Sequence, residues 1–261
     1  MPPAVEARPT IDRDWLERTA RADPLPHAFA LWDLDRTPQA VRFVSAVRAE
    51  ETVGYLLLWL GRRDRPVVHW FGPASLAPVF LPAFPAPPFL AVVPVEAEPA
   101  VAAAFPGCQS VPVKMMVRAP IRSERTARGV RRLDGSDRSE LAALAAAHRE
   151  ADLAAYGGLD PEVEPTWGAF DAGRLVGVAR AAVRLPFLWV IGGVFVEPAW
   201  RGRGLGSGLV TAVVEAAAVG GAPTGLYVRD EPPAARRLYE RLGFREIDRR
   251  AWVDVRTRGT G

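Results

Sequence analysis

The sequence predicts a mixed α/β (α+β) protein that consists of two similar domains in tandem. The 261 residues are enough for two ordinary domains, and 49% of them are hydrophobic, a usual share for a globular chain. A weak internal repeat relates the two halves. In addition, the second half contains an apolar strand, a glycine-rich turn and a helix in direct succession.

Cysteine content and hydropathy limit the cellular setting. Cys108 is the single cysteine, which excludes intrachain disulfides and thiolate metal clusters, and we interpret it as an inert thiol. The segment Met1–Asp14 has no apolar stretch like that of a signal peptide, and an apolar run such as Gly54–Leu60 is far too short to cross a bilayer. We therefore expect a cytoplasmic protein without a membrane partner.

The titratable residues predict neither a metal site nor a nucleic-acid surface. His27, His69 and His148 are scattered, and none has a partner at metal-ligand spacing. The sequence pI is about 9.5, but the net charge is only +3. The helical and aromatic motifs of nucleic-acid binders are absent, so we expect no nucleic-acid partner. A basic nucleic-acid binder remains an alternative function, and it would require a salt-dependent affinity for RNA or DNA.

The domain boundaries follow from a polar segment, Ala119–Arg128, that interrupts the hydrophobic pattern. It predicts an N-terminal domain over 1–120, a linker over 121–128 and a C-terminal domain over 129–261. In the repeat, Val113–Val117 matches the closing strand Trp252–Val255. The alternative is chance, because any two α/β segments can be aligned in this way.

The two halves differ where the second half has its glycine turn. The corresponding part of the first half, Ala74–Pro88, is rich in proline, which has no backbone N–H to offer. We therefore expect that the first half is degenerate and has lost ligand binding.

The glycine turn predicts an anion-binding site. The apolar run Leu188–Val196 predicts a strand buried on both faces, and apolar residues from Leu209 onward predict a helix. Between them, Gly202, Gly204 and Gly206 allow close approach to a ligand. The first turn of the helix adds unpaired N–H groups and the positive end of its dipole.

Two nucleotide-binding motifs do not fit this turn. A dinucleotide fingerprint needs a third glycine where Ser207 or Leu209 stands, and a Walker turn needs a lysine, but Lys114 is the one lysine of the chain. Ser207 also lacks the flanking glycines of a hydrolase nucleophile. The turn therefore belongs to another class of anion site.

A second helix is predicted downstream. Ala235, Leu238, Tyr239 and Leu242 form an apolar stripe at helical spacing, and Gly243 suits the left-handed residue that ends a helix. From spacing alone, Tyr239 is a core aromatic.

Two motifs together resemble the GNAT superfamily of acyl-CoA-dependent N-acetyltransferases. They are Val194-x-Val196-x-Pro198-x-x-Arg201-Gly202-x-Gly204-x-Gly206 and Ala235-x-x-Leu238-Tyr239-x-x-Leu242-Gly243-Phe244. The resemblance is clear over Val130–Val255. It implies two GNAT-like domains in tandem, each a mixed, mostly antiparallel twisted sheet flanked by helices, with the C-terminal one intact.

The resemblance also implies the chemistry. Acetyl-CoA would be the co-substrate, and a primary amine would attack its thioester directly, without a metal. A strand amide at Phe195 or Val196 would polarise the carbonyl, and Tyr239 would be the catalytic residue that protonates the leaving thiolate. The residues implied to bind the cofactor are Val194, Phe195, Val196, Arg201, Gly202, Arg203, Gly204, Leu205, Gly206 and Ser207.

Several points stay open at the level of sequence. Gly192 and Gly193 mark either a strand bulge or a close approach. The acceptor is a small-molecule or peptide amine, and the protein is a monomer or a homodimer. The alternative function is a non-catalytic module that binds or senses acyl-CoA. The candidates for the general base are a water chain or His148, Glu150, Asp152, Glu162 and Glu164.

Overall fold

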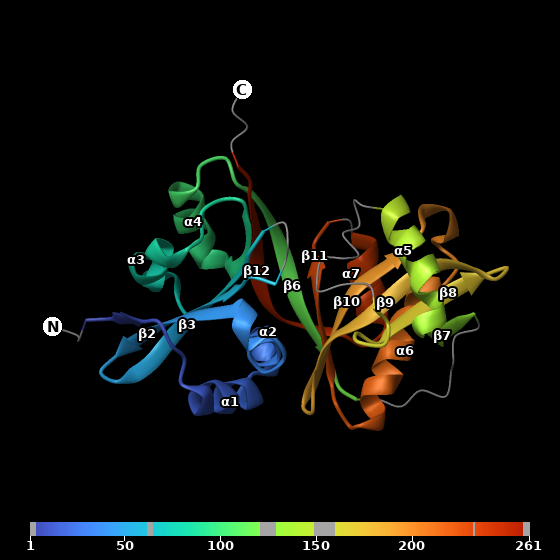
Figure 1. Ribbon diagram of the computed structural model, residues 1–261, viewed down its shortest axis with the longest axis horizontal. Coiled ribbons are helices and arrows are strands. Elements are labelled where there is room, and N and C mark those ends of the chain that lie inside the picture. Colours follow the sequence, from blue (N-terminus) through green and yellow to red (C-terminus); the bar gives the residue numbers. More distant parts are fainter. Residues whose placement is uncertain (1–3, 62–64, 121–128, 149–159, 232, 258–261) are drawn as a thin grey trace. The chain divides into compact units, whose positions relative to one another are not determined.

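The structure is a computed structural model that describes residues 4–61, 65–120, 129–148, 160–231 and 233–257 (Figure 1). The predicted linker, 121–128, and the candidate acids Glu150 and Asp152 lie outside these ranges. The chain divides into two compact units. Unit 1 comprises Met1–Lys114 with Asp248–Gly261, and unit 2 comprises Met115–Ile247.

Unit 1 is a sheet whose strand order is β1-β2-β3-β4-β5-β12. All its strand pairs are antiparallel except β4 with β5. Its elements are β1 (Glu6–Arg8), α1 (Arg13–Ala22), α2 (Pro24–Arg36), β2 (Val41–Arg48), β3 (Glu51–Trp59), β4 (Val67–Phe71), α3 (Ala77–Phe80), β5 (Phe89–Pro94), α4 (Glu98–Ala104), the first part of β6 (Gln109–Arg118) and most of β12 (Arg245–Val255).

Local sequence explains how the first helices begin. The side chain of Asp12 accepts a hydrogen bond from the backbone N–H of Trp15 and so caps α1, and α2 opens with Pro24, which suits a first helical turn.

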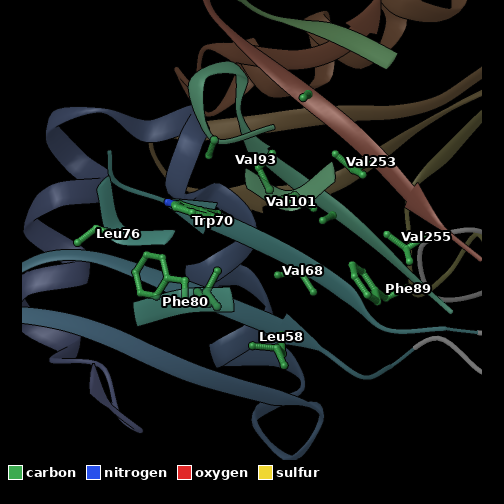
Figure 2. Packing of buried hydrophobic residues seen from close by; sticks show 14 of the residues in the cluster. Leu58, Val68, Trp70, Leu76, Phe80, Phe89, Val93, Val101, Val253 and Val255 are labelled. Atoms are coloured by element: carbon green, nitrogen blue, oxygen red, sulfur yellow. The ribbon is translucent and has the colours of Figure 1, made fainter. Parts of the chain in front are cut away.

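One face of the sheet carries a cluster of buried side chains that includes Leu76, Phe80 and Val101. Figure 2 shows Val253 and Val255 of β12 in the same cluster, so β12 belongs to the core of unit 1.

Unit 2 has a sheet with the corresponding strand order, β7-β8-β9-β10-β11-β6. The strands β10 and β11 pair in parallel, while β7, β8, β9 and β10 pair antiparallel in succession. Its elements are β7 (Val130–Arg132), α5 (Arg138–Ala147), β8 (Thr166–Asp171), β9 (Arg174–Leu185), β10 (Leu188–Val196), α6 (Leu205–Val219), β11 (Thr224–Arg229), α7 (Pro233–Arg241) and the last residues of β6.

Helices cover both faces of the sheet in unit 2. Leu209 and Val213 of α6 pack with Ala179 of β9, whereas Leu141 of α5 packs with its neighbour Val178. Because successive strand residues point to opposite faces, α5 and α6 lie on opposite sides of β9. The apolar run predicted to be a strand buried on both faces is β10, with the predicted bounds.

The two units exchange their last strands. The repeat pairs Val113–Val117 with Trp252–Val255, each as the closing strand of its own half. Instead, β12 pairs with β5, Val253 opposite Ala91, inside unit 1. In turn, β6 lies next to β11, and Met116 is buried in the core of unit 2.

The predicted fold class is confirmed. Each unit is a mixed, mostly antiparallel sheet flanked by helices. Among the described residues, no helix combines the length and the apolar composition that a membrane crossing requires.

Candidate active site

The glycine turn joins the end of β10 to the start of α6. Gly202 and Gly204 have φ angles of 78° and 80°, which side chains rarely tolerate. A Cβ atom at either position would have no neighbour within 4 Å, so open space lies beside both glycines. The two glycines therefore give the turn a left-handed backbone that no other side chain crowds.

The backbone of this turn offers a row of hydrogen-bond donors. The helix α6 has no side-chain cap, and its first backbone bond runs from the N–H of Gly208 to the carbonyl of Gly204. Within the described residues, the N–H groups from Gly202 to Ser207 make no hydrogen bond. Unpaired N–H groups at the positive end of a helix dipole form a site for an anion.

A buried carboxylate supports the entry to the turn. Glu197, which is 4% exposed, receives hydrogen bonds of 2.6 and 2.8 Å from Arg174. His148 lies 3.4 Å from the same carboxylate. The indole N–H of Trp200 donates to Asp171 at 2.9 Å. Together these contacts tie the short helical turn Pro198–Trp200 to β8, β9 and the end of α5.

The strands β10 and β11 separate beside the turn. Their parallel ladder ends where Ile191 pairs with Leu226, although both strands continue further. The β9–β10 register is irregular between Gly192 and Phe195, and Gly193 has a φ of 58°. The glycine pair thus marks both a bulge and a close approach, because a Cβ at Gly193 would lie 2.8 Å from Nε of Arg180.

Beyond the bulge, alternate amides of β10 face away from β9. The N–H of Glu197 donates to the carbonyl of Val176 on β9 at 2.9 Å. Since N–H directions alternate along a strand, the amide of Phe195 also points to β9, while those of Val194 and Val196 point to the side where β11 has separated. The carbonyl of Val196 accepts a hydrogen bond from Nε of Arg201 at 2.9 Å.

Tyr239 is carried by α7, which packs against the first turn of α6. A Cβ at Gly206 would lie 3.6 Å from Leu238, the residue before Tyr239. The Tyr239 ring is 7% exposed and meets Phe244 edge to face, at 5.8 Å between centroids. Its hydroxyl has no hydrogen-bond partner in the part of the chain that is described. Burial raises the pKa of this phenol to about 12, so it is neutral at physiological pH.

The structure separates the candidate bases. Glu162 is an exposed partner of Arg138, and His148 lies beside Glu197. Glu164 is partly buried two residues before β8, where it accepts a hydrogen bond from Arg180 at 3.0 Å. Burial raises the pKa of Glu164 even though Arg180 and Arg184 act in the opposite direction. Among the described candidates, Glu164 is the one linked to the bulge of β10.

Sequence reasoning did not single out Arg180. It is buried to 2% exposure between Glu164 and Gly193, and no short motif contains it. The one available signal was the glycine pair in mid-strand, which indicated that some group approaches the backbone there.

Comparisons with known proteins give one family match and several solved structures of similar fold. Residues 133–244 match the family described as acetyltransferase (GNAT) family. No curated protein matches the chain. Among solved structures, a Drosophila protein is similar at a TM-score of 0.68 and 17% identity, over 97% of this chain and 99% of the other.

Two further structures are informative about the fold. A GCN5-related N-acetyltransferase from Sphaerobacter thermophilus has a TM-score of 0.60 and 18% identity, over 97% of this chain and 96% of that one. A tandem GNAT protein from the clavulanic acid biosynthesis pathway has a TM-score of 0.57 and 16% identity, over 96% and 98% of the two chains. The fold is thus shared over nearly the whole chain, and residues 133–244 match the GNAT acetyltransferase family.

Proposed function

We propose that unit 2 binds acetyl-CoA and transfers its acetyl group to a primary amine by direct attack. The observation that carries this proposal is the row of unpaired N–H groups from Gly202 to Ser207 at the start of α6, with open space beside Gly202 and Gly204. A diphosphate fits such a row, because the donors and the helix dipole act on the same charge. Arg201 and Arg203, both exposed in this turn, add positive charge.

The separated strands supply a place for the thioester. Pantetheine would extend along β10, and the amide of Val194 or Val196 would donate to the carbonyl oxygen, where negative charge develops during attack. Because N–H directions alternate along β10, the amide of Phe195 points to β9, which argues against this amide as the donor to the thioester.

During the transfer, the amine loses one proton and the leaving thiolate gains one. The amine nitrogen bonds to the thioester carbon, the carbon–sulfur bond breaks, and the products are an amide and the free thiol of CoA. Tyr239 would give its proton to the leaving thiolate, a role that its neutral phenol supports. Glu164 would take the proton of the amine, through water, a role that its pKa, raised by burial, favours.

Unit 1 is proposed to be a degenerate copy without cofactor. Leu76 fills the space beside Gly54 and Gly72, where added Cβ atoms would lie 2.5 and 2.8 Å from it. Phe80 is fully buried in the same region. The segment that corresponds to the glycine turn therefore contributes to the hydrophobic core. A cytoplasmic location, where acetyl-CoA would be at hand, is part of the same proposal.

Calorimetry with CoA tests the proposed cradle. Gly204→Ala places a methyl group on its inner side, and Gly221→Ala is the matched control. Gly221 also has a left-handed φ, 72°, and open space around it, but it lies beyond the opposite end of α6. Both substitutions should destabilise the protein by about 1–2 kcal/mol. We expect CoA to bind the unsubstituted protein and the Gly221→Ala variant equally, and Gly204→Ala at least about tenfold more weakly.

Turnover completes the test. Release of free thiol from acetyl-CoA is measured against a panel of small amines and peptides. Binding of CoA together with amine-dependent thiol release supports an enzyme, whereas binding without release identifies an acyl-CoA sensor. Absence of binding by the unsubstituted protein, or equal weakening in both glycine variants, refutes the cradle.

A further inference from the structure

The guanidinium group of Arg180 has donors that the protein leaves unused. Its Nη1 atom donates to Glu164 at 3.0 Å. Its Nε and Nη2 atoms are buried and have no hydrogen-bond partner among the described residues. The whole residue is only 2% exposed. A buried donor without a partner costs free energy, and the cost is greater when the group is charged. Such a group in a folded protein indicates a missing partner.

The two unused atoms have a specific geometry. Nε and Nη2 form one edge of the planar guanidinium, with two nearly parallel N–H bonds. This fork matches the two oxygens of a carboxylate, which it binds with two hydrogen bonds at once. The contact with Glu164 uses a different atom, so it fixes the orientation of the group and leaves the fork edge unpaired.

Gly193 keeps side-chain atoms away from this edge. A Cβ there would lie 2.8 Å from Nε and 3.2 Å from Nη2 of Arg180. Any other residue would therefore cover the fork with its side chain. Gly193 also immediately precedes Val194, one of the residues whose amide is directed to the proposed thioester site. The fork edge thus lies next to the reacting end of the site.

We propose that Arg180 binds a carboxylate group of the acceptor, so that the substrates are amino acids or other amines with a carboxylate near the amine. This inference rests on the proposed function, since it assigns the substrate class of the same site. Glu164, held by Arg180, would then stand next to the amine of the bound acceptor. In a buried site the charge-assisted pair is stronger than in water and selects for the carboxylate.

Matched acceptors provide the test. Each amine is offered in three forms, as the amino acid, as its carboxamide and as the decarboxylated amine, and kcat/KM is measured by thiol release. The unsubstituted protein should favour the amino acid over the other two forms by roughly tenfold to a hundredfold, from hydrogen bonds to a charged group.

Arg180→Lys keeps the charge next to Glu164 but removes the fork. We expect it to lower kcat/KM for amino acids by a similar factor, mainly through KM, and to leave the carboxamides and decarboxylated amines nearly unchanged. Arg132→Met on β7, an exposed position, is the control and should retain the preference of the unsubstituted protein.

The outcomes separate the two proposals. If CoA binds and acetyl transfer occurs, but the three acceptor forms react equally well, the assignment of Arg180 is refuted while the acetyltransferase stands. The same holds if Arg180→Lys slows all three forms by one factor, which would indicate a structural role. If CoA fails to bind or no amine reacts, the proposed function itself fails and this inference with it.

Discussion

At the scale of single residues, Tyr239 is both a core aromatic, as its helical spacing predicts, and the proposed proton donor. Its ring belongs to the same buried cluster as Leu209 and Phe244, as helical spacing predicts. Its hydroxyl nevertheless has no hydrogen-bond partner in the described part of the chain, and burial keeps it protonated. A core aromatic whose phenol is unengaged can serve as a proton donor without loss of packing.

Replacement of Tyr239 by Phe separates these two roles. The ring and its packing remain, so the melting temperature and the affinity for CoA should not change. The rate constant kcat should fall by about a hundredfold if the phenol protonates the thiolate. Tyr55→Phe, which removes the hydroxyl of another buried tyrosine, should not alter kcat. An unchanged kcat in the Tyr239 variant would remove this residue from the mechanism.

The glycine turn could be predicted from the sequence, whereas the surroundings of Arg180 could not. Glycines spaced as in Gly202-x-Gly204 predict positive φ angles directly, because the constraint is local to each residue. The contact of Arg180 with Glu164 and Gly193 depends on three strands lying side by side, with Arg180 opposite Thr166 on one side and Gly192 on the other. Residues so far apart in sequence share no spacing rule.

At the scale of elements, strong local patterns gave accurate results. The strand β10 has the predicted bounds, and Gly243 has the predicted left-handed φ, 84°, just after α7. The proline-rich segment Ala74–Pro88 was interpreted only as unable to bind a ligand. It forms short helical turns, including α3, because proline is well suited to first helical turns, and its Leu76 and Phe80 are buried.

The helix α2 gives unit 1 a predictable sensitivity to acid. His27 is fully buried against β3, with its Nδ1 atom 2.8 Å from the Tyr55 hydroxyl. Burial and then the charge of Arg250 lower its pKa from 6.5 to about 4. In the unfolded chain this histidine gains a proton below about pH 6.5, whereas the folded protein resists protonation until about pH 4. Stability present above pH 6.5 is therefore lost as the pH falls toward 4.

Urea unfolding from pH 7 to pH 4.5 measures this effect. The free energy of unfolding should fall with pH, with up to about 3 kcal/mol attributable to His27. His27→Gln should be less stable at pH 7 and should show a shallower dependence on pH. The pKa of His69 is also lowered, to about 4. A variant with both His27→Gln and His69→Gln should therefore show a still shallower dependence of stability on pH. Parallel pH profiles for all three proteins would contradict this account.

At the scale of the whole molecule, the repeat predicted two similar units but not which strand closes each sheet. The segments 113–117 and 252–255 have the same apolar character, and either could close either sheet. The exchange depends on which edge each strand reaches, which hydrophobic pattern does not encode. Val253 and Val255 are 0% and 4% exposed, so the core of unit 1 depends on residues from the far end of the chain.

The exchange makes a definite prediction about fragments. A fragment of residues 1–120 contains the whole predicted N-terminal domain but lacks β12, which pairs with β5 from Phe89 to Pro94. It would lose the buried side chains of Ala251, Val253 and Val255, worth about 4 kcal/mol in a protein whose total stability is typically 5–15 kcal/mol. It would also expose β5, an entirely buried apolar strand, as an unprotected edge. We expect the fragment to aggregate and to show no cooperative thermal transition by circular dichroism.

A fusion of residues 1–114 to 248–261 through a flexible Gly/Ser linker should restore a cooperative transition, because it supplies the missing strand to the same core. If the fragment of residues 1–120 unfolds cooperatively and at the same temperature as the fusion, β12 is dispensable for unit 1 and the exchanged strand contributes little to its stability.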